Sequence, residues 1–273
     1  VLILLKKLNA PLKEQIVVLL HDVSHTAFSH AADWVFEDTI ENEDYQDLIH
    51  ETFLIKSEIP KIVEKYGFDI SEISKIENFG ILERPAPDLC ADRVDYALRE
   101  FMCWTNKQIV PFCVENLTTY NNKIIFKNKE AAFEFGKHFL RLQSEHWGGY
   151  QAVIKYKLLS DILKFALNKK ILTKEDFFTD DQAVISKLIN SNNESIKKQI
   201  DLLKTPKINY IIDKENPDFK LQKKFRYVDP EFLENNILKR LSQDINFKNI
   251  LEEHRKRNLD GISVKLQPIS IKN

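Results

Sequence analysis

Apolar positions along the first two-thirds of the chain recur every three to four residues, the spacing of amphipathic helices. This pattern predicts helices at residues 1–5, 12–21, 27–36, 45–56, 60–66, 87–104 and 131–168, the last interrupted near Gly148-Gly149. Shorter helices are predicted between residues 174 and 203. A break in the helical pattern at Val23-Ser24 indicates that the next residue, His25, lies on a turn. The bulk of the chain is therefore predicted to be helical.

The spacing changes after Pro206, where short runs of β-branched and aromatic residues predict strands. Strands are expected at residues 208–212, 219–228 and 262–267, and a helix at 230–241. An earlier hairpin is predicted at residues 117–126, with its turn at Asn121-Asn122. The expected fold is mainly α, with a short β-hairpin and a small C-terminal α+β portion. We expect a helical domain at residues 1–203 and a subdomain at 204–273.

Composition limits the classes of function. The chain has 273 residues, of which 43% are hydrophobic, so it can bury a substantial core. It has only 6 glycines and neither G-x-x-x-x-G-K-[ST] nor G-x-G-x-x-G, which argues against a P-loop or Rossmann nucleotide site. A net charge of −1 gives no global field for nucleic acid, and we interpret the basic runs at 220–226 and 254–257 as solvated surface.

The three cysteines, Cys90, Cys103 and Cys113, lack the spacing of metal ligands and suit a reducing cytosol. No apolar run approaches the ~20 residues of a membrane span, and no targeting segment is visible. We therefore expect a cytoplasmic protein without a membrane partner. Whether the chain forms a homo-oligomer is left open by the sequence.

The strongest chemical signal is the dipeptide His21-Asp22, which ends the apolar run of residues 15–20. An imidazole beside a carboxylate, completed by the distant carboxylate of Asp92, suits a divalent ion that must also hold phosphate oxygens and water. Asp92 opens a series with helical spacing that continues with Asp95, Tyr96 and Arg99. Asp95 is the alternative ligand, but we interpret it as a partner in a helix salt bridge.

Three further histidines lie near this pair in the sequence: His25, His30 and His50. His30 and Asp33 are three residues apart, which lets the carboxylate accept the imidazole N–H and fix its tautomer. The competing interpretation is that histidines among residues such as Ala27 and Phe28 are hydrogen-bonded core residues. We expect at least one of the three to act chemically.

With these residues in place, the chain resembles the HD superfamily of metal-dependent phosphohydrolases, and most closely its deoxynucleoside triphosphate triphosphohydrolase branch. The resemblance is specific from His21 to Asp92 and weaker to about residue 203. It implies an HD-domain helical bundle and a hydrolase that uses a divalent metal ion (Mn, Mg, Fe, Co or Zn). Its substrate would be a nucleotide or another phosphorylated small molecule.

The resemblance also implies roles for individual residues. The metal ligands would be His21, Asp22 and Asp92. The catalytic residues would be His25, His30, Asp33 and His50. The residues that contact phosphate and sugar would be Arg93, Tyr96, Arg141, Tyr150 and Gln151.

One feature departs from the family pattern. The family's first metal-binding histidine lies upstream of the His-Asp pair, usually in an H-S-x-G turn, whereas no histidine precedes His21 here. Two interpretations stay open. We expect the full-length protein to carry this ligand before Val1. Alternatively, the site is degenerate and the chain is a non-catalytic HD module that binds a nucleotide or a protein partner.

Overall fold

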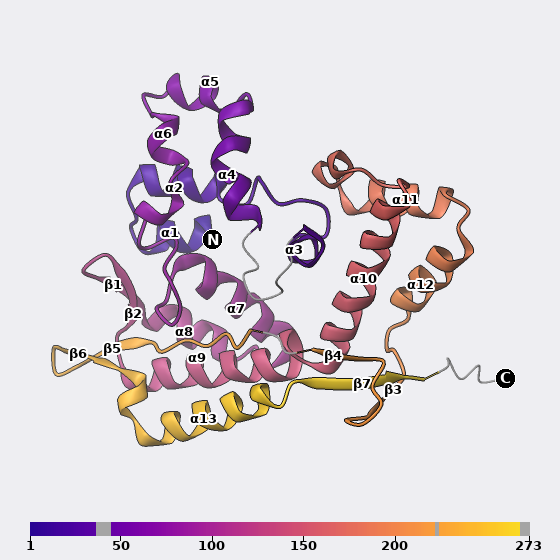
Figure 1. Ribbon diagram of the computed structural model, residues 1–273. Coiled ribbons are helices and arrows are strands. Elements are labelled where there is room, and N and C mark those ends of the chain that lie inside the picture. Colours follow the sequence, from indigo (N-terminus) through magenta and orange to yellow (C-terminus); the bar gives the residue numbers. More distant parts are fainter. Residues whose placement is uncertain (37–44, 222–223, 268–273) are drawn as a thin grey trace. The chain divides into compact units, whose positions relative to one another are not determined.

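The computed structural model describes residues 1–36, 45–221 and 224–267 and is mainly α-helical, as predicted (Figure 1). Its chain divides into two compact units that interleave along the sequence. The first unit comprises Val1–Val23, His50–Gly148 and Phe225–Leu259; the second comprises Ser24–Ile49, Gly149–Lys224 and Asp260–Asn273. Compact units need not be independently folding domains, so the division at residues 203 and 204 stays a prediction.

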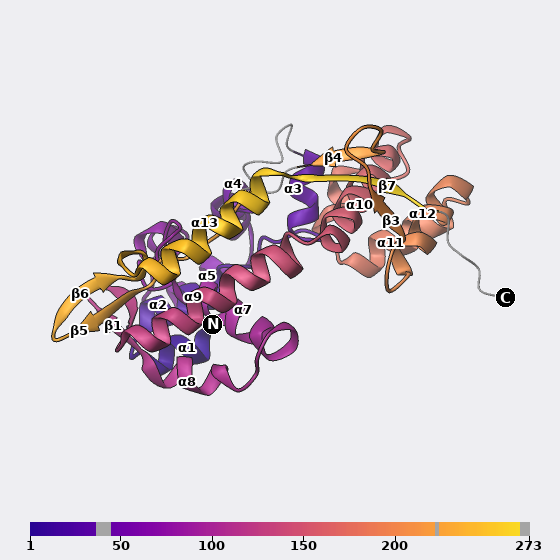
Figure 2. The same ribbon diagram turned by 90° about the horizontal axis from the view of Figure 1, so that it is seen from below.

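The first unit holds the N-terminal helices and the longest stretch of uninterrupted chain. Its helices are α1 (Leu2–Lys7), α2 (Leu12–Leu20), the part of α4 (Tyr45–Lys56) from His50 onward, α5 (Ile59–Glu64), α6 (Ile70–Ile73), α7 (Ala91–Trp104), α8 (Ile109–Asn116), α9 (Lys129–Leu142) and α13 (Ile245–Leu259). Single turns are η1 (Ile76–Asn78), the π-helical η2 (Gln143–Trp147) and η4 (Leu241–Gln243). Helices α9 and α13 lie side by side in Figures 1 and 2.

A four-stranded sheet completes this unit, with strand order β1-β2-β5-β6. Its strands are β1 (Leu117–Tyr120), β2 (Lys123–Phe126), β5 (Glu231–Glu234) and β6 (Ile237–Arg240). The predicted hairpin at 117–126 is confirmed, with positive φ at Asn121 and Asn122. The helix predicted at 230–241 is wrong, because Asn235 and Asn236 also adopt positive φ and form a two-residue hairpin turn. Helix α13 was not predicted.

Aromatic side chains fill the core between α7, α9 and the sheet. Phe135 of α9 is fully buried, and its ring lies 5.4 Å from that of Phe101 and 5.5 Å from that of Phe126. Phe139 extends the cluster one turn further along the same helix. Because Phe101 belongs to α7, this packing fixes the helix that begins just before Asp92.

His138 lies buried in the same region, with its ring 5.6 Å from that of Phe101. Burial lowers its pKa, and the nearby carboxylate of Glu134 only partly opposes this effect. His138 therefore binds a proton more readily in the unfolded chain, where its pKa has the ordinary value of 6.5, than in the folded protein. The folded protein loses stability as the pH falls through and below that value. We expect His138→Leu to reduce the loss of urea resistance between about pH 7.5 and about pH 5. An unchanged loss in the variant would contradict this assignment.

The second unit is built around α10 (Tyr150–Asn168), against which α3 (His30–Phe36) and α12 (Glu194–Lys204) pack. It also contains η3 (Lys174–Phe178), α11 (Asp181–Asn190) and the antiparallel strands β3 (Tyr210–Ile212), β4 (Phe219–Leu221) and β7 (Ile262–Leu266), in the order β3-β7-β4. The predicted strands at 208–212 and 262–267 are confirmed. Of the strand predicted at 219–228, residues 219–221 form β4 and residues 224–228 form no strand. Residues 222 and 223, which also belong to the predicted basic run, lie outside the described residues.

Helix α3 starts later than predicted, at His30, because Phe28 and Ser29 have positive φ values of 62° and 43°. Helix α7 likewise starts at Ala91 rather than residue 87. In the described part of the chain, no helix has the length and apolar character needed to cross a bilayer.

Candidate metal centre

His21 is held where α2 ends. The helix stops at Leu20, and His21 caps it with φ −60° and ψ −30°. Its Nδ1 lies 2.7 Å from the Val18 carbonyl oxygen. A carbonyl oxygen only accepts, so Nδ1 carries a proton and donates it. In the neutral imidazole, Nε2 then keeps its lone pair, as a metal-binding histidine requires.

Two carboxylates surround that nitrogen. Nε2 of His21 lies 3.2 Å from Oδ2 of Asp22 and 3.5 Å from Oδ1 of Asp92. One potential ligand atom from each residue lies within 4.8 Å of the others. Asp22 follows His21 directly, whereas Asp92 comes from the first turn of α7. The structure thus brings the three predicted metal ligands into one cluster.

The electrostatics of the cluster also suit a cation. Burial by itself lowers the pKa of His21, but the hydrogen bond to Asp92 and the negative charge of Asp22 outweigh it, so the net shift is upward. Two carboxylates that attract a proton to Nε2 attract a metal ion at the same place. An imidazole with two carboxylates is a donor set compatible with Mg, Mn, Fe, Co or Zn. The residues therefore fit a divalent metal.

Glu14 joins the two helices that carry the cluster, a contact the sequence did not predict. Its Oε1 accepts the backbone N–H groups of Ile81 and Leu82, at 3.2 and 3.3 Å. The carbonyl of Ile81 accepts from Ala91 N–H, and that of Leu82 from Asp92 N–H. The buried carboxylate of Glu14 on α2 thereby holds the segment Ile81-Leu82, which in turn bonds to the first residues of α7. The sequence did offer one indication of this contact, because Glu14 lies on the apolar face of a predicted helix, where a carboxylate needs a hydrogen-bonding partner.

We expect Glu14→Ala to destabilise the first unit, because it leaves two buried N–H groups unpaired. Each such group typically costs about 1–3 kcal/mol. Glu14→Gln retains an acceptor oxygen and should lose less. Urea unfolding of both variants checks this, and equal stability of Glu14→Ala and the parent would contradict it.

His50 belongs to the same unit as the cluster and is buried on α4. Burial lowers its pKa, and the positive charge of His21 lowers it further. His50 is therefore a neutral imidazole near neutral pH, able to accept a proton. Its predicted catalytic role stays a prediction.

His25, His30 and Asp33 belong to the second unit. His25 lies outside any helix, as the predicted break implied, and its ring is 5.4 Å from that of His30. Nδ1 of His30 lies 3.2 Å from Oδ2 of the buried Asp33. The predicted His30–Asp33 pair is therefore formed, and the catalytic roles of these residues stay predictions.

Arg93 and Tyr96 follow Asp92 on α7. Nη1 of Arg93 donates to the carbonyls of Arg84 and Asp88, and Nη2 lies 3.5 Å from Glu83. The guanidinium thus fastens the loop that precedes α7. Tyr96 packs against Trp147, and burial raises the pKa of its hydroxyl to about 12, so it remains a neutral phenol.

Arg141 forms an exposed ion pair with Glu145, at 2.8 Å on the same helical stretch. In the second unit, the Tyr150 ring stacks on that of Tyr210 with centroids 5.3 Å apart. The Gln151 amide makes two bonds to Ile208, donating to its carbonyl and accepting its N–H, at 2.8 and 2.9 Å. The predicted contacts of these residues with substrate stay predictions.

The paired bonds of Gln151 give its substitution a measurable cost. Gln151→Ala should destabilise the protein by about 1–3 kcal/mol, because both backbone groups of Ile208 lose their partner. Thermal unfolding measures this cost. A variant that unfolds like the parent while its KM for substrate rises would show that the amide serves substrate instead.

The fold and this cluster define a mainly helical protein with a candidate divalent-metal centre. No model of a known protein family matches the chain. It is 34% identical over 270 residues to the uncharacterized protein YdhJ of Bacillus subtilis, a match that covers 97% of this chain and 82% of YdhJ. The chain therefore belongs to the family of YdhJ.

Two of the other similarities are to proteins named as phosphohydrolases. Over 163 residues the chain is 40% identical to the metal-dependent phosphohydrolase cns2 of Cordyceps militaris, a match covering 57% of this chain and 47% of cns2. A solved structure of a hypothetical protein from Aquifex aeolicus shares the fold, with a TM-score of 0.61 and 16% identity over 93% of this chain and 82% of that chain. The structure of a phosphohydrolase from Bacteroides thetaiotaomicron also shares the fold, with a TM-score of 0.59 and 14% identity. That match covers 87% of this chain and 76% of the other chain. None of these distinguishes the triphosphohydrolase branch, which stays a prediction.

Proposed function

We propose that this protein is a metal-dependent phosphohydrolase that acts on nucleotides, with deoxynucleoside triphosphates as the favoured substrates. The observation that carries the proposal is the cluster of His21, Asp22 and Asp92, in which Nε2 of a correctly oriented imidazole meets two carboxylates. The similarity to cns2, which is named a metal-dependent phosphohydrolase, supports metal-dependent hydrolysis from an independent direction, and its name specifies no substrate.

His21, Asp22 and Asp92 would hold the ion. When bound, a divalent metal lowers the pKa of water and neutralises charge that develops on phosphorus. The chain's own contribution is positional. Val18 sets the tautomer of His21, and the Glu14 bridge sets the start of α7 relative to α2.

Proton transfer falls to the histidines. His50 is kept neutral by burial and can accept a proton from a reacting oxygen. His30 is oriented by Asp33, which fixes the ring nitrogen that carries the proton. His25, in contact with the ring of His30, is assigned to the phosphate.

Substrate recognition is assigned to Arg93, Tyr96, Arg141, Tyr150 and Gln151. Arg93 contributes fixed positive charge, and the tyrosines offer faces for sugar or base. Nucleotides are favoured because these residue types follow the metal ligands in the order of the nucleotide-cleaving relatives that the chain resembles.

The test is a metal and substrate panel. The protein would be loaded in turn with Mn, Mg, Fe, Co and Zn, and its metal content would be measured. Release of phosphate or triphosphate would then be followed with deoxynucleoside triphosphates, nucleoside monophosphates and cyclic nucleotides. Metal-dependent triphosphate release supports the proposal in full.

The other outcomes are informative in different ways. Phosphate release from a monophosphate or cyclic nucleotide supports the hydrolase and overturns the favoured substrate. Nucleotide or protein binding without metal and without turnover overturns the hydrolase and leaves a non-catalytic binding module.

A further inference from the structure

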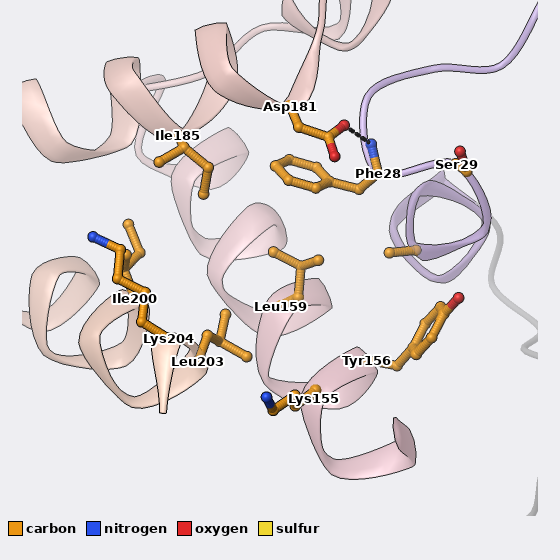
Figure 3. A pocket seen from close by; sticks show the side chains of 11 residues that line it. Phe28, Ser29, Lys155, Tyr156, Leu159, Asp181, Ile185, Ile200, Leu203 and Lys204 are labelled. Carbon is orange, nitrogen blue, oxygen red and sulfur yellow. Dashed lines mark hydrogen bonds between the residues drawn. The ribbon is translucent and has the colours of Figure 1, made fainter. Parts of the chain in front are cut away.

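The second unit contains a cavity of about 560 Å³ that no part of the proposed reaction uses. Its walls come from α3 and the turn before it and from α10, α11 and α12, all within that unit (Figure 3). Small-molecule sites typically measure about 300–1,000 Å³. The cavity is therefore large enough for a ligand rather than for a single water molecule.

Most of the wall is hydrocarbon. Leu159, Ile185 and Leu203 line it from three different helices, and each is only partly buried although it packs against the core of this unit. Ile200 lies at its base and is nearly fully buried. This apolar surface borders the core but is exposed to water. A ligand that covers it removes it from water, which favours binding.

Charged groups give the cavity a polarity. In the view of Figure 3, Asp181 and Lys155 lie at opposite ends, with Leu159 between them. The Asp181 carboxylate already accepts the backbone N–H of Phe28, at 2.7 Å. Lys155 donates to the Thr205 carbonyl, and within the described residues neither it nor Lys204 forms an ion pair. Two lysines and one carboxylate thus border the apolar wall, which leaves an excess of positive charge at the end of the cavity that holds the lysines.

The turn that carries Phe28 is conformationally strained. Phe28 and Ser29 have φ values of 62° and 43°, a region that side chains larger than glycine seldom adopt. The bond from Phe28 N–H to Asp181 and that from Ala27 N–H to the Phe177 carbonyl hold the turn in place. Strain of this kind concentrates at ligand-binding segments, and here it places an aromatic ring on the cavity wall.

We propose that this cavity binds an amphipathic anion, with an alkyl or aryl body along Phe28, Leu159 and Ile185 and a single carboxylate head at Lys155 and Lys204. The apolar wall supplies the affinity. The lysines select an anionic head over a neutral or cationic one. None of the residues that line the cavity is assigned a role in the proposed hydrolysis.

Calorimetric titration of the whole chain with dodecanoate, dodecanol and dodecylamine tests the site. Dodecanoate is expected to bind saturably with one site per chain and more tightly than the other two probes. Lys204→Glu should weaken dodecanoate on the order of five-fold while leaving dodecanol unchanged. Lys197→Glu, on the same helix but outside the cavity, is the matched control and should bind like the parent.

A second pair of variants tests the cavity volume. Ile185→Trp should fill the space and abolish binding, whereas Ile189→Trp, one turn further along α11 and exposed, should not. Circular dichroism confirms that both variants fold. Equal affinity for dodecanoate and dodecylamine, or undiminished binding by both Lys204→Glu and Ile185→Trp, would overturn the proposal.

Discussion

Asp92→Asn is expected to remove metal binding and hydrolysis together. The substitution keeps the shape of the side chain but replaces a charged oxygen, 3.5 Å from Nε2 of His21, with a neutral amide. Loss of a residue that only orients a metal ligand typically costs about 10–100-fold, so loss of a ligand should cost at least about 100-fold in metal affinity and turnover. Metal content and the rate of phosphate or triphosphate release measure both effects.

Asp95→Asn is the matched control, since Asp95 lies one turn further along the same helix. Its carboxylate pairs with Arg99 at 3.0 Å, as the helical spacing predicted. We expect this variant to keep its metal and its rate. The opposite result, with Asp95→Asn inactive and Asp92→Asn active, would exchange the roles of the two aspartates and refute the assigned cluster.

Local patterns predicted much of the fold because they act over a few residues. Helix α4 occupies the predicted residues 45–56, and the hairpin at 117–126 turns at the predicted asparagines. The same signal was missed at Asn235-Asn236, where leucine and isoleucine at helical spacing suggested a helix. There the free energy of pairing β5 with β2 and β6 outweighs helix propensity.

The metal cluster was predictable because two of its three ligands, His21 and Asp22, are adjacent in the sequence and the third is a single distant aspartate. The contacts that hold these ligands in place were not predictable. The Val18 carbonyl that orients His21 is a backbone group, and the contact of Glu14 with Ile81 and Leu82 spans 67 and 68 residues. Spacing along one helix carries no information about such contacts, since they depend on how the helices pack.

The cavity in the second unit was missed for a related reason. Its wall combines residues from four helices and a turn, and each apolar residue considered alone is typical of a core. The positive φ at Phe28 and Ser29 has no sequence signal of the kind that Gly or Asn provides. Only the folded structure separates apolar residues that fill a core from those that border an open space.

Phe135→Ala is expected to produce a large loss of stability in the first unit. Its ring is fully buried and packs against Phe101 of α7 and Phe126 of β2. Removal of the ring therefore leaves a cavity between this helix and this strand. Replacing a buried phenylalanine by alanine typically costs about 3–5 kcal/mol. With a urea dependence of about 1–3 kcal/mol per molar, the unfolding midpoint should fall by about 1–5 M.

Met102→Ala provides the comparison, because Met102 adjoins Phe101 on α7 but is 58% exposed. Its effect should stay within about 0.5 kcal/mol. Since Phe101 lies on the helix that begins beside Asp92, Phe135→Ala should also weaken metal binding once the first unit loosens, whereas Met102→Ala should not. Equal midpoints for the two variants would show that this aromatic cluster does not hold α7 in place.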